Sequence, residues 1–278
     1  YSDDVFIDGM IYAKAVRTKY PRAKVDRIDI SKALEHPACV TVLTGADVPF
    51  NKTGHLIPDW DVLIKEGDIT RYIGDSVALV ATTEKKYLDE VCNLVEYTEL
   101  EPILDPMDAL KPDAPKLHPD GNILSHQTLS RGDVDKAIAE AAFVVTNHYS
   151  TPQTDHAFME PECAVAYREG DEIHLYSGSQ NVFDDRREVA RMLGIPNESV
   201  KVHGMLVGGG FGGKEDMSVQ HHASLMAWIT GKPTKVLFSR QESINIHTKR
   251  HAMEMDITTA CDAEGNLVAS KVNIVSNC

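Results

Sequence analysis

The residue types most capable of chemistry gather in one glycine-rich stretch. Residues 208–213 contain five glycines in six positions, and Phe211 is the exception. Because glycine has no Cβ, such a backbone reaches positive φ and can approach a ligand closely. A β-branched apolar run at 200–207 precedes the stretch and a helix-like run at 216–230 follows it. A strand, a glycine turn and a helix start together point backbone N–H groups at a ligand, preferably an anion.

Two common phosphate motifs match these glycines, but the surrounding residues oppose both. The spacing satisfies the dinucleotide pattern G-x-G-x-x-G and, with Lys214, the beginning of a P-loop. A P-loop needs Ser or Thr after the lysine to hold Mg²⁺, whereas this chain has Glu215, which would repel phosphate. The dinucleotide fold needs an acidic residue about twenty positions further on. Residues 232–235 read Lys-Pro-Thr-Lys instead, so neither motif is favoured.

Composition restricts the class of protein. The 278 residues carry 28 Lys and Arg against 42 Asp and Glu, a net charge of −14, which argues against nucleic acid or anionic membrane as the main partner. No apolar run approaches the length of a membrane span, and no secretory signal is visible, so we predict a cytoplasmic protein. The five cysteines are scattered without C-x-x-C spacing, which indicates reduced thiols and no iron–sulfur cluster on this chain.

The order of the elements predicts an α+β fold in two domains. Strand-like runs and two helices fill about the first hundred residues, and one of these helices is expected at 84–95 from its apolar spacing. Residues 102–119 then hold five of the 13 prolines, which oppose helix and central strand alike. We therefore expect a first domain at 1–104, a proline-rich linker at 105–122 and a second domain at 123–278. Hairpins with interspersed helices favour α+β over a doubly wound sheet.

Motifs along almost the whole chain resemble one family. Gly-Gly-Gly-Phe-Gly-Gly-Lys-Glu at 208–215 resembles the signature loop of the molybdenum hydroxylases, the xanthine dehydrogenase/aldehyde oxidase family. Further matches occur in the family's order at 8–13, 72–78, 95–100, 133–137, Gln153-x-x-His156-x-x-Met159-Glu160-Pro161 and 179–181. The resemblance implies a small α/β hammerhead domain, followed by the first part of a larger α+β molybdopterin-binding domain.

The resemblance also implies roles for individual residues. In this family a pterin dithiolene holds the molybdenum, so no side chain of this chain is expected to be a metal ligand. The backbone N–H groups of Phe211 and Gly212 would face the oxo ligand of the metal and the pterin, and the Gln180 amide would donate to the same oxo group. Glu215 lies where purine-oxidising members place a glutamate that contacts the substrate. The family's base glutamate lies beyond this chain, so no catalytic residue is assigned here.

Each of these residues also has a simpler structural explanation. Gln180 could be a polar residue at a strand end that bonds its own turn. Phe211 could fill core beneath the loop, and Glu215 could interact with a helix dipole in a first turn. Two further expectations concern neighbouring residues: Lys214 is expected to be a solvated charge, and Gln153, His156 and Glu160 are expected to be buried structural hydrogen-bonders.

The function implied is that of part of a molybdenum-cofactor subunit. Such an enzyme hydroxylates an aza-aromatic heterocycle of the purine type, or an aldehyde, with water as the oxygen source. FAD and 2Fe–2S clusters are expected on partner subunits or domains, together with the remainder of the molybdopterin-binding subunit. These 278 residues are expected to be inactive alone. The alternative is a non-catalytic structural or assembly segment of such a complex.

Overall fold

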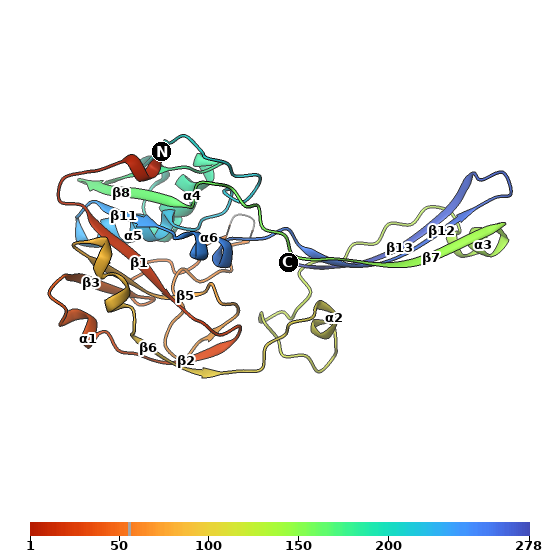
Figure 1. The fold of residues 1–278 in the computed structure, drawn as a ribbon, viewed down its shortest axis with the longest axis horizontal. Helices are drawn as coiled ribbons and strands as arrows, with labels where there is room; N and C mark the ends of the chain where they lie inside the picture. Colours follow the sequence, from red (N-terminus) through yellow and green to blue (C-terminus); the bar gives the residue numbers. More distant parts are fainter. Residues whose placement is uncertain (55–56) are drawn as a thin grey trace. The chain divides into compact units, whose positions relative to one another are not determined.

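The computed structural model describes residues 1–54 and 57–278, and these residues form two compact units (Figure 1). Unit 1 consists of residues 1–101 and 156–248, and unit 2 consists of residues 102–155 and 249–278. Each unit therefore combines segments that are far apart in the sequence. Separate antiparallel and mixed sheets with interspersed helices confirm the α+β class.

A seven-stranded mixed sheet forms the centre of unit 1, with the strand order β10-β9-β8-β11-β1-β5-β3. The strands are β1 (Ile11–Arg17), β3 (Cys39–Thr44), β5 (Ser76–Thr82), β8 (Cys163–Glu169), β9 (Glu172–Ser177), β10 (Val200–Gly204) and β11 (Thr234–Leu237). Strands β1 and β11 pair in parallel, with Ile11 opposite Thr234, and so join the two segments of the unit. Every residue of β5 is buried, as its continuous apolar sequence predicts.

Helices α4 (Val182–Leu193) and α5 (Gln220–Thr230) contribute to the core of this unit (Figure 1). Met192 and Leu193 of α4 and Leu225 and Met226 of α5 belong to the same buried cluster as Leu175 of β9. Helix α4 ends at Leu193, because Gly194 adopts the left-handed conformation that a helix terminus favours. The core therefore fixes both helices against the strands that carry the candidate site.

Helix α5 begins later than predicted. The predicted run started at 216, but residues 214–219 are irregular and the helix starts at Gln220. The Gln220 side chain explains the difference, because its Oε1 accepts hydrogen bonds from the N–H groups of Ser218 (2.9 Å) and Val219 (3.0 Å). These bonds satisfy donors immediately before the first turn. The glycine stretch therefore does not open directly into a helix.

The remaining part of unit 1 contains a three-stranded sheet, β4-β2-β6, and short helices. Their bounds are β2 (Ala23–Ile28), β4 (Ile69–Thr70), β6 (Val95–Glu99), α1 (Ser31–Leu34), α6 (Arg240–Ile246), η1 (Ser2–Asp4), η2 (Lys85–Tyr87), η3 (Asp89–Val91) and η4 (Asn197–Ser199). The α-helix predicted at 84–95 is wrong, since this segment forms the 3₁₀ turns η2 and η3. The buried residues Leu88, Val91 and Leu94 are three positions apart, which matches the 3₁₀ period of three residues per turn.

Unit 2 contains a three-stranded antiparallel sheet in the order β13-β12-β7. Its elements are α2 (Pro106–Ala109), α3 (Val134–Glu140), β7 (Phe143–Thr151), β12 (Ala252–Cys261) and β13 (Leu267–Asn277). The proline-rich segment was expected to exclude helix, yet Pro106 begins α2. Proline is tolerated there because its missing N–H lies in the first turn, and the Asp105 side chain accepts the Met107 N–H at 2.8 Å.

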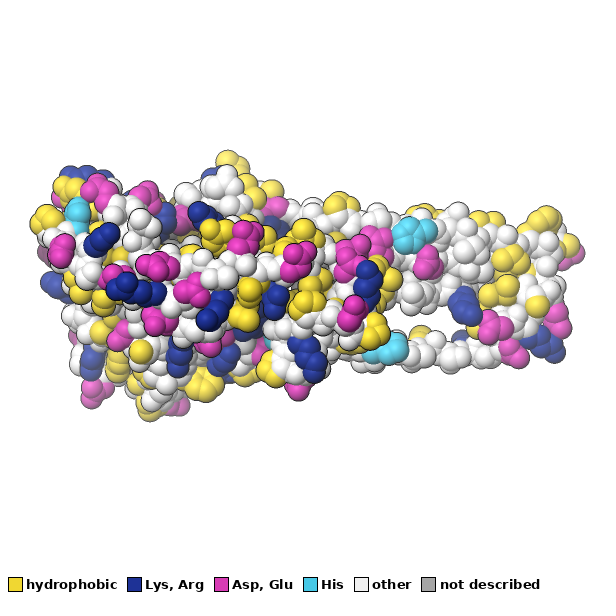
Figure 2. Space-filling model, turned by 90° about the horizontal axis from the view of Figure 1, so that it is seen from below, with side chains coloured by type: hydrophobic (Ala, Val, Ile, Leu, Met, Phe, Trp, Pro, Cys, Tyr) yellow, Lys and Arg dark blue, Asp and Glu magenta, His cyan; other side chains and the backbone are white. Residues whose placement is uncertain are grey.

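Two surface properties bear on the class of partner. Among the described residues no helix has both the length and the apolar content needed to cross a membrane. On the face shown in Figure 2, Lys and Arg side chains are interspersed with Asp and Glu side chains. A mixed surface with an acidic excess differs from the basic stripe that binds a phosphate backbone.

Candidate cofactor-binding site

The glycine loop, residues 208–213, lies on a second segment of unit 1, residues 156–160, which we call the bed segment. The Gly208 N–H donates to Glu160 Oε2 at 2.7 Å, and the Glu160 N–H donates to the Gly208 carbonyl oxygen at 3.2 Å. Phe158, in the middle of the bed segment, is only 1% exposed. The glycine loop therefore packs on the side chains of the bed segment.

Contacts with these side chains explain why most of the loop residues are glycine. A Cβ atom would lie 2.6 Å from Glu160 Cβ at Gly208, 2.2 Å from Gln180 Oε1 at Gly210 and 2.9 Å from His156 Cγ at Gly213. The sequence predicted that the loop lacks Cβ atoms so that a ligand can approach its backbone closely. At these three positions, however, the missing Cβ makes room for the protein's own side chains.

The Gln180 side chain stabilises the glycine loop through two hydrogen bonds. It follows β9, and its Oε1 accepts hydrogen bonds from the N–H groups of Gly212 (3.0 Å) and Lys214 (3.2 Å). The alternative that Gln180 bonds its own turn is wrong, because the Asn181 N–H and the Ser179 hydroxyl make that turn at 3.0 Å. Within the described chain, Gln180 Nε2 has no acceptor, so this donor remains available to a ligand.

Three consecutive N–H groups of the loop also have no acceptor in the described part of the chain. Those of Gly209, Gly210 and Phe211 donate to no acceptor among residues 1–54 and 57–278, whereas the Gly212 N–H is taken by Gln180. The expectation that the N–H groups of Phe211 and Gly212 both face the cofactor is wrong in this structure for Gly212, whose N–H is taken by Gln180, and it stays a prediction for Phe211. Successive free N–H groups in a loop with left-handed residues attract an anion.

Phe211 itself has an unusual conformation. Its φ is +54°, and left-handed backbone costs a non-glycine residue about 1–2 kcal/mol. Its side chain is 75% exposed, so the alternative that it fills core beneath the loop is wrong. A strained, exposed aromatic residue on a well-supported loop points to a functional constraint.

Lys214 ends the loop in a buried ion pair. Its side chain is 4% exposed, its Nζ lies 2.8 Å from Glu160 Oε2, and it stands 4.6 Å from the centre of the Phe158 ring. The expectation of a solvated charge is therefore wrong. Because Glu160 Oε2 also accepts the Gly208 N–H, one carboxylate fixes both ends of the loop.

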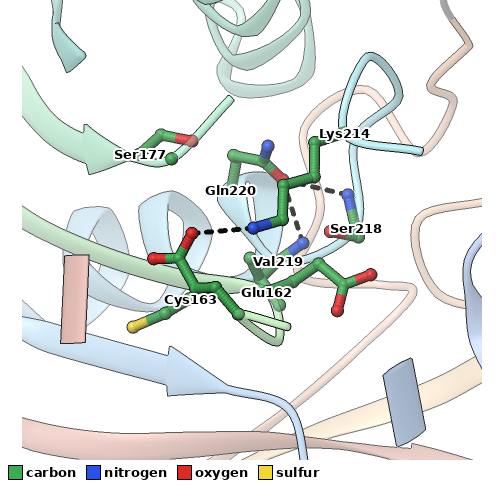
Figure 3. Close-up of a pocket in the computed structure, with 9 residues that line it drawn as sticks. Glu162, Cys163, Ser177, Lys214, Ser218, Val219 and Gln220 are labelled. Atoms are coloured by element: carbon green, nitrogen blue, oxygen red, sulfur yellow. Dashed lines mark hydrogen bonds and ion pairs between the residues drawn. The ribbon is translucent and has the colours of Figure 1, made fainter. Parts of the chain in front are cut away.

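A small cavity lies beside Lys214, the residue that follows the loop (Figure 3). Its lining includes Glu160, Glu162, Ser177, Lys214 and Gln220, and its volume of about 10 Å³ is room for about one water molecule. An aromatic heterocycle does not fit there.

Asp185 of α4 is buried close to the strand end that leads to Gln180. Burial raises the pKa of this carboxyl to about 7, while hydrogen bonds from Ser177, Ser179 and Gln220 oppose the rise. An acid with a raised folded-state pKa contributes stability below its unfolded pKa of 3.8, and that stability is lost as the pH rises through about 7.

We therefore expect Asp185→Asn to raise the melting temperature relative to the wild type much more at pH 8 than at pH 4.5. The buried His221, whose pKa is lowered to about 3 by burial, titrates in both proteins and cancels in the comparison. Thermal unfolding at the two pH values measures the effect, and the exposed Asp171→Asn is the control. An equal difference at both pH values would show that Asp185 is ionised throughout.

The other residues singled out from the sequence have mixed outcomes. Glu215 is exposed and lies before α5, so the alternative of a first-turn interaction with the helix dipole is wrong. His156 and Glu160 are half-buried as structural hydrogen-bonders, whereas Gln153 is exposed in unit 2. Among the described residues no group of three or more His, Cys, Asp or Glu side chains could hold a metal ion.

Two protein-family models match the chain. One is described as a molybdopterin cofactor-binding domain and covers residues 117–278. The other is described as the a/b hammerhead domain of aldehyde oxidase and xanthine dehydrogenase and covers residues 1–101. Together these matches leave few residues uncovered, and the second confirms the predicted hammerhead domain at the beginning of the chain.

Curated relatives extend the likeness along the whole chain. It is 38% identical over 281 residues to a probable xanthine dehydrogenase subunit of Bacillus subtilis, covering 100% of this chain and 37% of the relative. It is 36% identical over 278 residues to the nicotinate dehydrogenase large molybdopterin subunit of Eubacterium barkeri, covering 99% of this chain and 65% of the relative. The chain thus spans between about a third and two thirds of these relatives' lengths.

Solved structures share the fold. The aldehyde oxidoreductase of Desulfovibrio gigas matches with a TM-score of 0.91 at 24% identity, over 97% of this chain and 31% of that one. The CO dehydrogenase of Oligotropha carboxidovorans matches with a TM-score of 0.86 at 26% identity, over 99% of this chain and 37% of that one.

Proposed function

The chain belongs to the molybdenum hydroxylase family of xanthine dehydrogenase and aldehyde oxidase, and we propose that it forms part of the molybdopterin-binding subunit of such an enzyme. The enzyme would hydroxylate an aza-aromatic heterocycle of the purine type, or an aldehyde, with water as the oxygen source. The observation that carries this proposal is the supported glycine loop with three free N–H groups beside the free Gln180 amide nitrogen.

The donor set fits a molybdenum–pterin group. When bound, that group supplies the oxidation chemistry, while this chain supplies hydrogen-bond donors and a rigid wall. The Phe211 N–H and Gln180 Nε2 would bind the negatively polarised oxygen of the cofactor. The side-chain oxygen of Gln180, Oε1, keeps the loop in place by accepting hydrogen bonds from the N–H groups of Gly212 and Lys214. Pre-positioned donors of this kind cost no reorganisation during the reaction.

The partners and location are further parts of the proposal. FAD and 2Fe–2S clusters would lie on partner subunits or domains and accept the electrons, and the remaining part of the molybdopterin-binding subunit would supply the base glutamate. A cytoplasmic location is supported by the five cysteines, all of which are unpaired.

Elemental analysis of the complete complex tests the proposed function. Purified from cells grown without tungstate, the complex should contain about one molybdenum per molybdopterin-binding subunit. The rival function is a non-catalytic structural or assembly segment, inactive alone. A complex without molybdenum would exclude the hydroxylase and leave this rival.

Glu215 is proposed to contact a purine-type substrate, since its carboxylate is exposed just after the loop. Replacing it with Gln should lower kcat/KM for a purine by about 10–100-fold, because a hydrogen bond to a charged group contributes about 1.5–3 kcal/mol. Activity on an aldehyde should not change. Steady-state kinetics on both substrates measure the ratio, with Glu198→Gln on η4 as the control. An unchanged substrate preference would remove Glu215 from the substrate site.

A further inference from the structure

A row of three side chains leads from the glycine loop into the interior of unit 1. The His156 ring lies beneath the loop, 3.7 Å from the Cβ position of Gly212 and 2.9 Å from that of Gly213. His156 Nδ1 faces His247 Nε2 at 3.4 Å, and His247 Nδ1 lies 3.4 Å from Glu162 Oε1. The row therefore connects the loop to a carboxylate at the beginning of β8.

The proton on His247 has a defined place. Its Nδ1 faces the Ser243 carbonyl oxygen, which only accepts hydrogen bonds, and lies 3.4 Å from Glu162 Oε1. Nδ1 must therefore carry the hydrogen. The His247 ring, 7% exposed and 5.0 Å from the Phe158 ring, is thereby held with Nε2 toward His156. This is how a carboxylate orients an imidazole through one of its nitrogens.

Glu162 is an unfavourable residue for the fold alone. It is 4% exposed, its carboxylate oxygens make no hydrogen bond in the described part of the chain, and its charged partners are His247 at 3.4 Å and the buried Arg17 guanidinium, which interacts with it electrostatically. Burying a carboxylate that is paired but not directly hydrogen-bonded costs stability. A glutamine of the same size would avoid burying the charge. A residue that lowers stability where a neutral isostere would serve is expected at a functional position.

We propose that Glu162 and His247 are positioning residues that hold the His156 imidazole beneath Gly212 and Gly213. Through that ring they keep the glycine loop in the conformation that offers its free N–H groups. The proposal rests on the proposed function of the loop as the cofactor wall. It assigns this role to residues that contact neither substrate nor cofactor.

Amide exchange of the glycine loop in the complete complex, with and without cofactor, tests the proposal. The amides of Gly212, Gly213 and Lys214 all donate inside the protein and report on the loop. Glu162→Gln should raise their exchange about tenfold and lower bound molybdenum. Glu162→Asp, which keeps the charge, should restore part of the protection. His203→Gln, a half-buried histidine of β10, is the matched control.

The coupling between Glu162 and His156 provides the second test. Since these two side chains make no mutual hydrogen bond or ion pair in the described residues, His247 must transmit any interaction between them. The fold-increase of amide exchange in the double variant Glu162→Gln/His156→Gln should therefore be smaller than the product of the fold-increases in the two single variants.

Three results would overturn the proposal. The first is a rate of amide exchange of the loop in Glu162→Gln that equals the wild-type rate. The second is an equal increase of the exchange rate in peptides of β8 and α6. The third is an increase in the double variant that equals the product of the two single increases. A wild-type complex without molybdenum would instead contradict the proposed function, because exchange in the cofactor-free form measures the loop independently.

Discussion

Replacing Gln180 with alanine is expected to lower turnover by about 10²–10³-fold, the range for removing one pre-positioned donor from an active site. The variant loses two things at once. It loses Nε2, the donor proposed to face the cofactor, and it loses Oε1, the acceptor for the N–H groups of Gly212 and Lys214. Steady-state kinetics and molybdenum content of the complete complex measure the two losses.

Gln180→Glu separates the two roles. The carboxylate keeps acceptors for the loop N–H groups but has no hydrogen to donate, so the loop should stay ordered while turnover still falls. Gln241→Ala, an exposed glutamine on α6 that bonds only Asn245 among the described residues, should leave turnover at the wild-type level. Normal turnover in Gln180→Glu would show that Gln180 acts only as a brace for the loop.

Some elements carry local signals in the sequence. The hairpin of β8 and β9 turns at Arg168-Glu169-Gly170-Asp171, as its turn residues indicate, and α4 ends at Gly194. The parallel pairing of β1 with β11 could not be predicted in this way, because Ile11 and Thr234 come from opposite ends of the chain. The predicted boundaries at 104 and 122 remain a prediction.

The site was predicted in part for the same reason. The glycine loop and Gln180 were found because contiguous motifs mark them. The bed segment was recognised only as a motif, and nothing in the sequence indicated that Glu160 pairs with Lys214 or that Phe158 fills the space beneath the loop. The sequence pattern also offered the explanation that Phe211 fills core, because it is an aromatic residue among glycines. The side chains of the bed segment already fill the space beneath the loop, and Phe211 is exposed.

This support has a measurable consequence at Gly210. In Gly210→Ala the new Cβ would lie 2.2 Å from Gln180 Oε1 and 2.7 Å from its Cδ, too close for real atoms. The Gln180 amide cannot move away without breaking the hydrogen bonds from Gly212 and Lys214. Either the loop shifts or Gln180 gives up the hydrogen bonds that hold the loop, and a displacement of about 1 Å at an active site can lower turnover by about 10²-fold. Molybdenum content should fall with turnover.

Gly67→Ala is a demanding control for this prediction. Gly67 has a φ of +92°, so alanine there is strained by about 1–2 kcal/mol, but no atom lies within 4 Å of the new Cβ. Gly210 lacks a positive φ, so its substitution adds a steric clash without that strain. If backbone strain alone governed cofactor binding, Gly67→Ala would be the more harmful variant. We expect the reverse: a lower melting temperature with normal molybdenum for Gly67→Ala, and lost molybdenum for Gly210→Ala. Normal loading and turnover in Gly210→Ala would show that the contact with Gln180 does not set the position of the loop.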